Sequence, residues 1–173
     1  MKVIEGDLIK LALEGNFDVI AHGCNCFNKQ KSGIAKQMVN TFETDMFNLE
    51  YDGLSGAIDK LGRIDYNEFE IVDNVATQID NYHNRFKEAS YMKVVNCYTQ
   101  YRYGLNHPDG QYAPLDYTAL TLCMKKINHI FAGQKLGLPY LIGCGLAGGD
   151  EDSVLHILKT ELNNVDLYLV KLK

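Results

Sequence analysis

The chain has 173 residues, of which 46% are hydrophobic and 23% are charged, and its formal net charge is -5. This length favours one domain with a full hydrophobic core, so we expect residues 1–173 to form a single domain. The acidic balance gives no support to nucleic-acid or membrane-surface binding, because a phosphate backbone needs clustered cations. No apolar run approaches the ~20 residues that span a bilayer.

The first residues, MKVIEGDLIK, lack the charged-then-apolar pattern of a leader peptide, so we expect a cytoplasmic protein. We also expect a monomer that requires no cofactor. The five cysteines are odd in number and scattered among apolar runs, which indicates reduced, buried thiols. Cys24-x-Cys26 is a poor zinc signature without a second ligand pair. We therefore expect packing cysteines and no metal.

Short apolar runs alternate with helical patterns, which is typical of an α/β layer fold. In the first part of the chain, residues 2–6 are expected to form a strand and 7–15 a short helix. A buried strand at 17–23 and a helix at 32–42 follow. Ile34, Met38 and Phe42 are spaced for one face of that helix.

The second half of the chain continues this alternation. A strand is expected at 91–100, a long helix at 114–132, a buried strand at 138–143, a helix at 150–162 and a strand at 166–172. Residues 43–90 are less legible: 60–72 resemble a strand with turns, and the charged pattern of 75–89 favours a surface helix.

Two strand-to-helix junctions are rich in glycine. The first reads HGCNCFNKQKSGIA, where Gly33 opens a helix whose N-terminal amides can bind an anion. The second reads IGCGLAGGDED and allows a tight loop with inward-facing amides. Neither is a Walker loop nor a G-x-G-x-x-G motif. Because both follow predicted buried strands, where open sheets bind ligands, the pair suggests a diphosphate ligand.

These motifs, in this order, resemble the macrodomain family, whose members bind ADP-ribose. The resemblance spans almost the whole chain and is weakest over the variable segment 43–90. It implies a three-layer α/β/α fold with a central mixed, mostly parallel sheet. It also implies ADP-ribose or its 1''-phosphate as a small-molecule ligand.

The resemblance carries ligand-binding roles to individual positions. EGDL places Asp7 at the adenine amino group, with Leu8 beside it, and VIAHGCNC places Asn25 next to the distal ribose. SGIA corresponds to the loop that wraps the diphosphate, and LIGCGLAGGD to the second phosphate loop. The implied binding residues are Asp7, Leu8, Gly33, Ile34, Ala35, Thr99, Gln100, Tyr101, Gly143, Gly145, Leu146, Ala147, Gly148 and Gly149.

Three departures bear on which branch of the family the chain resembles. Lysine-dependent de-ADP-ribosylating members carry a Thr-Lys pair where this chain has Thr99-Gln100, and an amide cannot form a Schiff base. The aspartate that some of them carry after GCGL is Ala147 here. Asp150 and Asp152 are replacements in principle, although acids at a helix start are usually caps.

The third departure is His22, which stands where most macrodomains have asparagine. H-G-C-N is similar to the H-S-C-N of the yeast-type ADP-ribose 1''-phosphate phosphatases, and histidine can relay a proton near neutral pH. A hydrogen-bonded histidine at a strand end is the alternative. We therefore expect His22 and Asn25 to be catalytic, with Lys29, Lys31 and Ser32 as candidates for the terminal phosphate.

The expected function is hydrolysis of ADP-ribose 1''-phosphate to ADP-ribose and phosphate, without a metal. Two alternatives remain open: a module that binds ADP-ribose or a related NAD metabolite without turnover, and a hydrolase that removes ADP-ribose from proteins or nucleic acids. One aromatic side chain can stack on adenine or cover the ribose, and the candidates are Tyr98, Tyr101, Tyr103 and Tyr112. For Tyr98, which is in strand register with Val94 and Asn96, a core position is an equal alternative.

Overall fold

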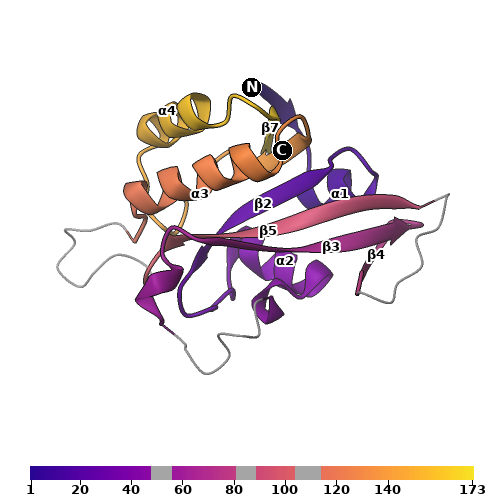
Figure 1. Cartoon of the computed structure of the whole chain (residues 1–173), viewed down its shortest axis with the longest axis horizontal. Helices are drawn as coiled ribbons and strands as arrows, with labels where there is room; N and C mark the ends of the chain where they lie inside the picture. The colour runs from indigo at the N-terminus through magenta and orange to yellow at the C-terminus, as the bar shows by residue number, and fades with distance from the viewer. Residues whose placement is uncertain (48–55, 81–88, 104–113) are drawn as a thin grey trace.

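Figure 1 shows the computed structural model of the chain, which describes residues 1–47, 56–80, 89–103 and 114–173. The first half contains β1 (Lys2–Glu5), α1 (Leu8–Leu13), β2 (Val19–Asn25), α2 (Gly33–Phe42), and the 3-10 turns η1 (Thr44–Met46) and η3 (Ile58–Lys60). The second half contains β3 (Ile64–Val72), β4 (Val75–Gln78), β5 (Ser90–Gln100), α3 (Tyr117–Ile130), β6 (Lys135–Pro139), α4 (Glu151–Glu161) and β7 (Asp166–Lys171).

The strands form one seven-stranded sheet in the order β1-β7-β6-β2-β5-β3-β4. The first four neighbouring pairs in this order, β1-β7, β7-β6, β6-β2 and β2-β5, are parallel. In contrast, β3 pairs antiparallel with both β5 and β4. The sheet is therefore mixed and mostly parallel, as the sequence predicted. The five parallel strands end at one common edge, where ligands bind in open α/β sheets.

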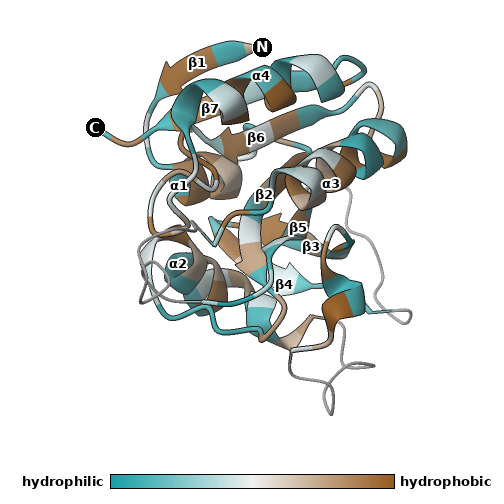
Figure 2. Cartoon of the chain, turned by 90° about the vertical axis from the view of Figure 1, so that its left-hand side faces the viewer, coloured by the Kyte–Doolittle hydropathy of each residue, from teal (hydrophilic) through white to brown (hydrophobic). Residues whose placement is uncertain are grey.

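Helices cover both faces of the sheet. Figure 2 views the sheet with β1 at the top and β4 below, α1 and α2 on the left and α3 on the right. The strand β2 sends Val19 and Ala21 into the core under α3 and α4, and Ile20 into the core under α1 and α2. This alternation of buried side chains explains why the strand reads as one continuous apolar run. The predicted three-layer α/β/α architecture is confirmed.

Two predicted elements differ from the structure. The strand expected at 138–143 is β6, at Lys135–Pro139, and the chain turns from Tyr140 onwards. Gly137 interrupts the apolar pattern of this strand. A β-carbon at position 137 would lie 2.9 Å from Leu8 and from Phe17, so close packing requires glycine there. The helix expected at 75–89 is wrong at its start, since residues 75–78 form β4, paired with β3. Residues 81–88 lie outside the described part.

The segment 43–90 contributes two strands to the sheet. Its described portion holds β3 and β4, which extend the sheet on the side away from β1. Among the described helices, none combines the length and apolarity needed to cross a bilayer.

Candidate functional site

A cavity of about 750 Å³ lies at the carboxyl edge of the parallel strands. Its walls come from the ends of β2 and β5, from the loop that leads into α2 and from the loop that follows β6. It gathers most of the predicted site residues, namely Asn25, Lys29, Lys31, Ser32, Gly33, Ile34, Ala35, Thr99, Gln100, Gly143, Gly145, Leu146 and Ala147. Two loops distant in sequence therefore face one space.

One wall is the first turn of α2. Its N-cap residue, Ser32, makes no side-chain capping hydrogen bond, and the first intrahelical bond runs from the Lys36 amide to the Ser32 carbonyl. The three preceding helical residues all line the cavity. Aspartates cap α1, α3 and α4 instead, through Asp7, Asp116 and Asp150. An uncapped helix start offers free amides and a partial positive charge to an anion.

The opposite wall is the loop after β6. Its tight turns are closed internally, since the Gly148 amide donates to the Gly145 carbonyl and the Gly149 amide to the Gly143 carbonyl. Within the described residues, the amides of Gly145, Leu146 and Ala147 donate no hydrogen bond. Three successive unpaired amides form the kind of concave donor surface that binds anions. Gly148 and Gly149 thus shape the loop and do not line the cavity.

Asn25 organises the loop between β2 and α2. Its Oδ1 accepts from the amides of Phe27 and Lys29, both at 3.1 Å, and its Nδ2 donates to the Lys29 carbonyl at 2.9 Å. The side chain is 5% exposed. Although Asn25 lines the cavity, these bonds make it a residue that positions the Lys29–Ser32 wall.

His22 does not line the cavity. Its ring is completely buried, and Nε2 lies 2.8 Å from Asn96 Oδ1. Because Asn96 Nδ2 donates to the Thr44 carbonyl, its Oδ1 faces His22, which puts the imidazole proton on Nε2. Burial lowers the pKa of His22 to about 4, although the bond to Asn96 acts in the opposite direction. A buried neutral imidazole counts against the expected proton relay.

A hydrogen-bond chain nevertheless connects His22 to the cavity wall. It runs through Asn96 to Thr44, whose Oγ1 donates to Gln30 Oε1 at 2.7 Å. Gln30 is 6% exposed and lines the cavity. Gln30 is not among the residues predicted from the sequence, since an amide between two lysines carries no periodic or motif signal. His22 therefore belongs to a network that holds the loop.

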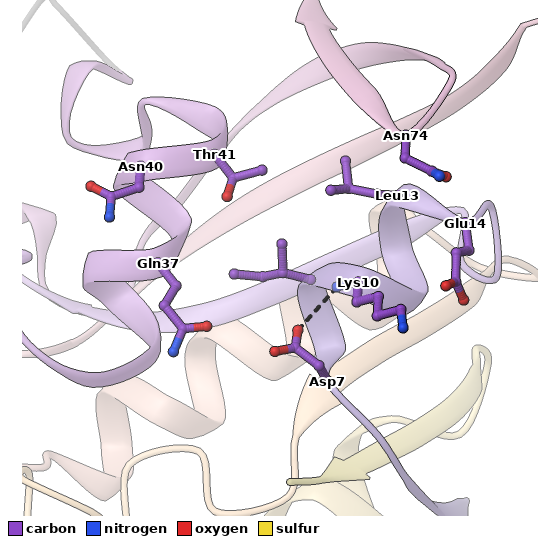
Figure 3. Close-up of a pocket in the computed structure, with 9 residues that line it drawn as sticks. Asp7, Lys10, Leu13, Glu14, Gln37, Asn40, Thr41 and Asn74 are labelled. Atoms are coloured by element: carbon purple, nitrogen blue, oxygen red, sulfur yellow. Dashed lines mark hydrogen bonds between the residues drawn. The ribbon is translucent and has the colours of Figure 1, made fainter.

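Other predicted residues lie away from this cavity. Leu8 is a core residue of α1, and Asp7 borders a separate groove of about 390 Å³ between α1 and α2 (Figure 3). There, one carboxylate oxygen of Asp7 accepts from the Lys10 amide at 3.0 Å, and Gln37 of α2 lies across the groove. The prediction that Asp7 contacts adenine is untested.

Of the candidate tyrosines in the described part of the chain, one lines the cavity and two do not. Tyr98 is buried and donates to Asp65 at 2.7 Å, whereas Tyr101 packs against Phe27 and donates to the Gly56 carbonyl. Tyr103 lines the cavity and is 56% exposed. Tyr112 lies outside the described residues.

The electrostatic character of the cavity is neutral to positive. Lys29 and Lys31 line it, and its described lining includes no carboxylate. Cys24 also lines it, and burial raises the pKa of its thiol well above the ordinary value, so it stays protonated. Asp150, a possible catalytic replacement by sequence, caps α4: its carboxylate accepts from the Ser153 amide at 2.9 Å. The arrangement can hold an anionic ligand, but it presents no obvious base.

A metal centre has no support in the described part of the chain. No group of three or more histidine, cysteine or acidic side chains there is placed to hold an ion. Cys26 is fully buried, and Cys24 contacts the sheet network through Asn96 Oδ1 at 3.4 Å. Both are packing residues, and of the two only Cys24 lines the cavity.

No protein-family model matches the chain. An uncharacterised 17.5 kDa protein of Enterobacteria phage T4, from the tk-vs intergenic region, is 32% identical over 178 residues, which covers 98% of this chain and 95% of that protein. The macrodomain of Thermus aquaticus DarG has a similar structure, with a TM-score of 0.58, 17% identity and coverage of 98% and 96% of the two chains. Thermosipho africanus DarTG in complex with ADP-ribose is also similar, with a TM-score of 0.58 and 14% identity, over all of this chain and 42% of that one. The chain therefore belongs to the family of the phage T4 protein, and its fold is that of a macrodomain.

Proposed function

We propose that the cavity binds ADP-ribose, with the diphosphate between the two loops. The observation that carries the proposal is the pairing of an uncapped helix start on α2 with the unpaired amides of Gly145–Ala147 across one cavity. Two such donor surfaces suit two linked phosphates, and the absence of a carboxylate from the described lining removes repulsion. This choice of ligand is supported by Thermosipho africanus DarTG, which is in complex with ADP-ribose and of which 42% has this fold.

Calorimetric titration of the purified chain with ADP-ribose tests the proposal. We expect saturable binding of one molecule per chain, weakened by salt because phosphate contacts contribute to it. Adenosine serves as a control, since it lacks both phosphates. Failure of ADP-ribose to bind at about 1 mM, which corresponds to about 4 kcal/mol of binding free energy, would remove the proposal.

A second candidate is hydrolysis of ADP-ribose 1''-phosphate, which the two lysines of the cavity favour. Lys29 and Lys31 lie on the loop that Asn25 holds, and cations of this kind stabilise a transferring phosphoryl group. His22 takes no part in this version of the mechanism, because it is buried and neutral. The attacking water then has to give its proton to the substrate phosphate, so turnover is expected to be slow.

Phosphate release from ADP-ribose 1''-phosphate separates these two candidates. Tight binding of ADP-ribose with no phosphate release selects the binding module. Release that disappears in the double variant Lys29→Ala, Lys31→Ala, but persists in His22→Gln, selects hydrolysis at the loop. Removal of ADP-ribose from proteins or nucleic acids has the weaker case: Gln100 and Ala147 line the cavity where a lysine and an aspartate would act, and Gln100 Nε2 is bonded to the Arg102 carbonyl at 2.8 Å.

A further inference from the structure

The loop after β6 is anchored to the rest of the described structure at one point. Within the described residues, the backbone hydrogen bonds of residues 143–149 join near neighbours in the chain, with one exception. The exception is the Leu115 amide, which donates to the Ala147 carbonyl at 3.1 Å. An anion-binding loop needs its carbonyl oxygens turned away from the anion, so this bond helps to keep the loop amides available.

The Leu115 side chain packs against the base of the same loop. Leu115 is 5% exposed and belongs to the hydrophobic core cluster that also contains Ile142 and Ala147. A β-carbon at Gly143 would lie 2.9 Å from a Leu115 methyl carbon, and one at Gly149 would meet Leu115 as well. The backbone of Gly149 is outside the left-handed region, so close packing and not conformation excludes a side chain there. Leu115 therefore contacts both ends of the loop.

Leu115 also ties this loop to the end of β5. Gln100 and Leu115 form an isolated antiparallel bridge, and the Asp116 amide donates to the Thr99 carbonyl at 2.9 Å. Thr99 and Gln100 line the cavity, whereas Leu115 does not. Two walls of the cavity, the end of β5 and the loop after β6, are therefore joined by a residue that lies outside the cavity.

We propose that Leu115 is a positioning residue for the ligand: it fixes the loop after β6 against the end of β5, so that the amides of Gly145–Ala147 face the diphosphate. This inference rests on the proposed function, which supplies the diphosphate. Leu115 needs no contact with the ligand for this role. By thermodynamic linkage, a ligand that binds the ordered loop stabilises in turn the bond between Leu115 and Ala147.

The first test compares Leu115→Ala with Leu167→Ala, measuring melting temperature and ADP-ribose affinity. Leu167 belongs to the same core cluster and is 1% exposed, but it lies near the amino end of β7 and does not line the cavity. Both changes leave a void in the core, so both are expected to lower the melting temperature. Only Leu115→Ala is expected to weaken ADP-ribose binding, by about tenfold. Leu115→Met nearly conserves the side-chain volume and is expected to retain most of the affinity.

The second test uses the wild type alone, so it holds even if Leu115→Ala does not fold. Amide hydrogen exchange is measured with and without ADP-ribose. Exchange at the Leu115 amide is expected to slow by about tenfold on binding, although Leu115 does not line the cavity. The control is the Gly133 amide, which donates to the Asn164 carbonyl in the turn before β6, and its exchange is expected to slow less.

Failure of the inference and failure of the proposed function give different results. An affinity in Leu115→Ala no lower than in Leu167→Ala would overturn the positioning role and leave the nucleotide site intact. The same holds if exchange at Leu115 slows no more than exchange at Gly133 when ADP-ribose binds. If ADP-ribose does not bind the wild type, the proposed function fails and the inference fails with it.

Discussion

The buried neutral state of His22 makes the stability of the fold depend on pH in a way that can be measured. The perturbation is acidification, compared between the wild type and His22→Gln. Glutamine places an amide N–H near the position of imidazole Nε2, so it can still donate to Asn96 Oδ1, but it does not titrate. The variant therefore removes the proton equilibrium and keeps the hydrogen bond.

The sign and size follow from the two pKa values of His22. The unfolded chain protonates this histidine near its ordinary value of 6.5, and the folded chain only near 4, because burial disfavours the charged ring. The stability that the neutral ring supplies is therefore fully present above pH 6.5 and is lost as the pH falls towards 4. With about 1.4 kcal/mol per pKa unit, the full loss is about 3 kcal/mol, and about 2 kcal/mol is gone by about pH 5.

Urea unfolding at about pH 7.5 and about pH 5, followed by circular dichroism, measures this loss. The wild type is expected to lose about 2 kcal/mol more than His22→Gln between these conditions. The other four histidines are common to both proteins and cancel in the difference. Equal losses in the two proteins, or an NMR titration of His22 near 6.5, would refute the buried neutral ring and restore it as a candidate proton relay.

Three substitutions test the walls of the cavity. Ser32→Asp adds a capping carboxylate to α2 and is expected to stabilise the fold by about 1 kcal/mol while weakening ADP-ribose binding in calorimetry. Asn163→Asp is the charge control: it adds the same charge at the Asn128 contact and should leave the affinity for ADP-ribose unchanged. Gly149→Ala would place a β-carbon against a Leu115 methyl carbon and the Gly143 carbonyl oxygen, so loss of binding and a lower melting temperature are expected. A β-carbon at Gly145 meets nothing within 4 Å, and equal losses of stability in Gly149→Ala and Gly145→Ala would contradict the steric argument. Asn25→Ala removes three loop hydrogen bonds and is expected to weaken ADP-ribose binding about tenfold or more. Amide hydrogen exchange should then accelerate at Lys29, and an unchanged exchange rate would show that the loop keeps its conformation without Asn25.

The layered fold was predictable because its signals are local. Aspartates before α1, α3 and α4 are recognisable helix starts, and β2 and β5 read as apolar runs since both of their faces are buried. The bounds of β6 were missed because Gly137 serves close packing against α1, a tertiary requirement that no local pattern records. The start of the predicted surface helix failed for a similar reason, since pairing with β3 overrides the local pattern of Val75–Gln78.

The loops that form the candidate site were predictable from the sequence, but the role of each side chain in it was not. Both glycine-bearing loops meet at one cavity because parallel strands end at one edge, which the α/β alternation implies. Whether a side chain at a strand end faces the cavity depends on register and packing. His22 and Asn25 stand only three positions apart, yet His22 is completely buried and does not line the cavity, whereas Asn25 does.

Register also explains why the polar network behind the cavity escapes sequence reasoning. Asn96 lies directly across from His22 in the β2–β5 ladder, but they are 74 residues apart in the chain. Thr44, in the segment where the sequence was least legible, completes the connection to Gln30. Because Gln30 belongs to the loop that Asn25 also holds, we expect a change at His22 to affect binding of the proposed ligand through loop position and not through proton transfer. Affinity in His22 variants should therefore follow the order of this loop. In the wild type, affinity should not depend on pH between about 6 and about 8, because this range lies at least about two units above the pKa of the buried ring.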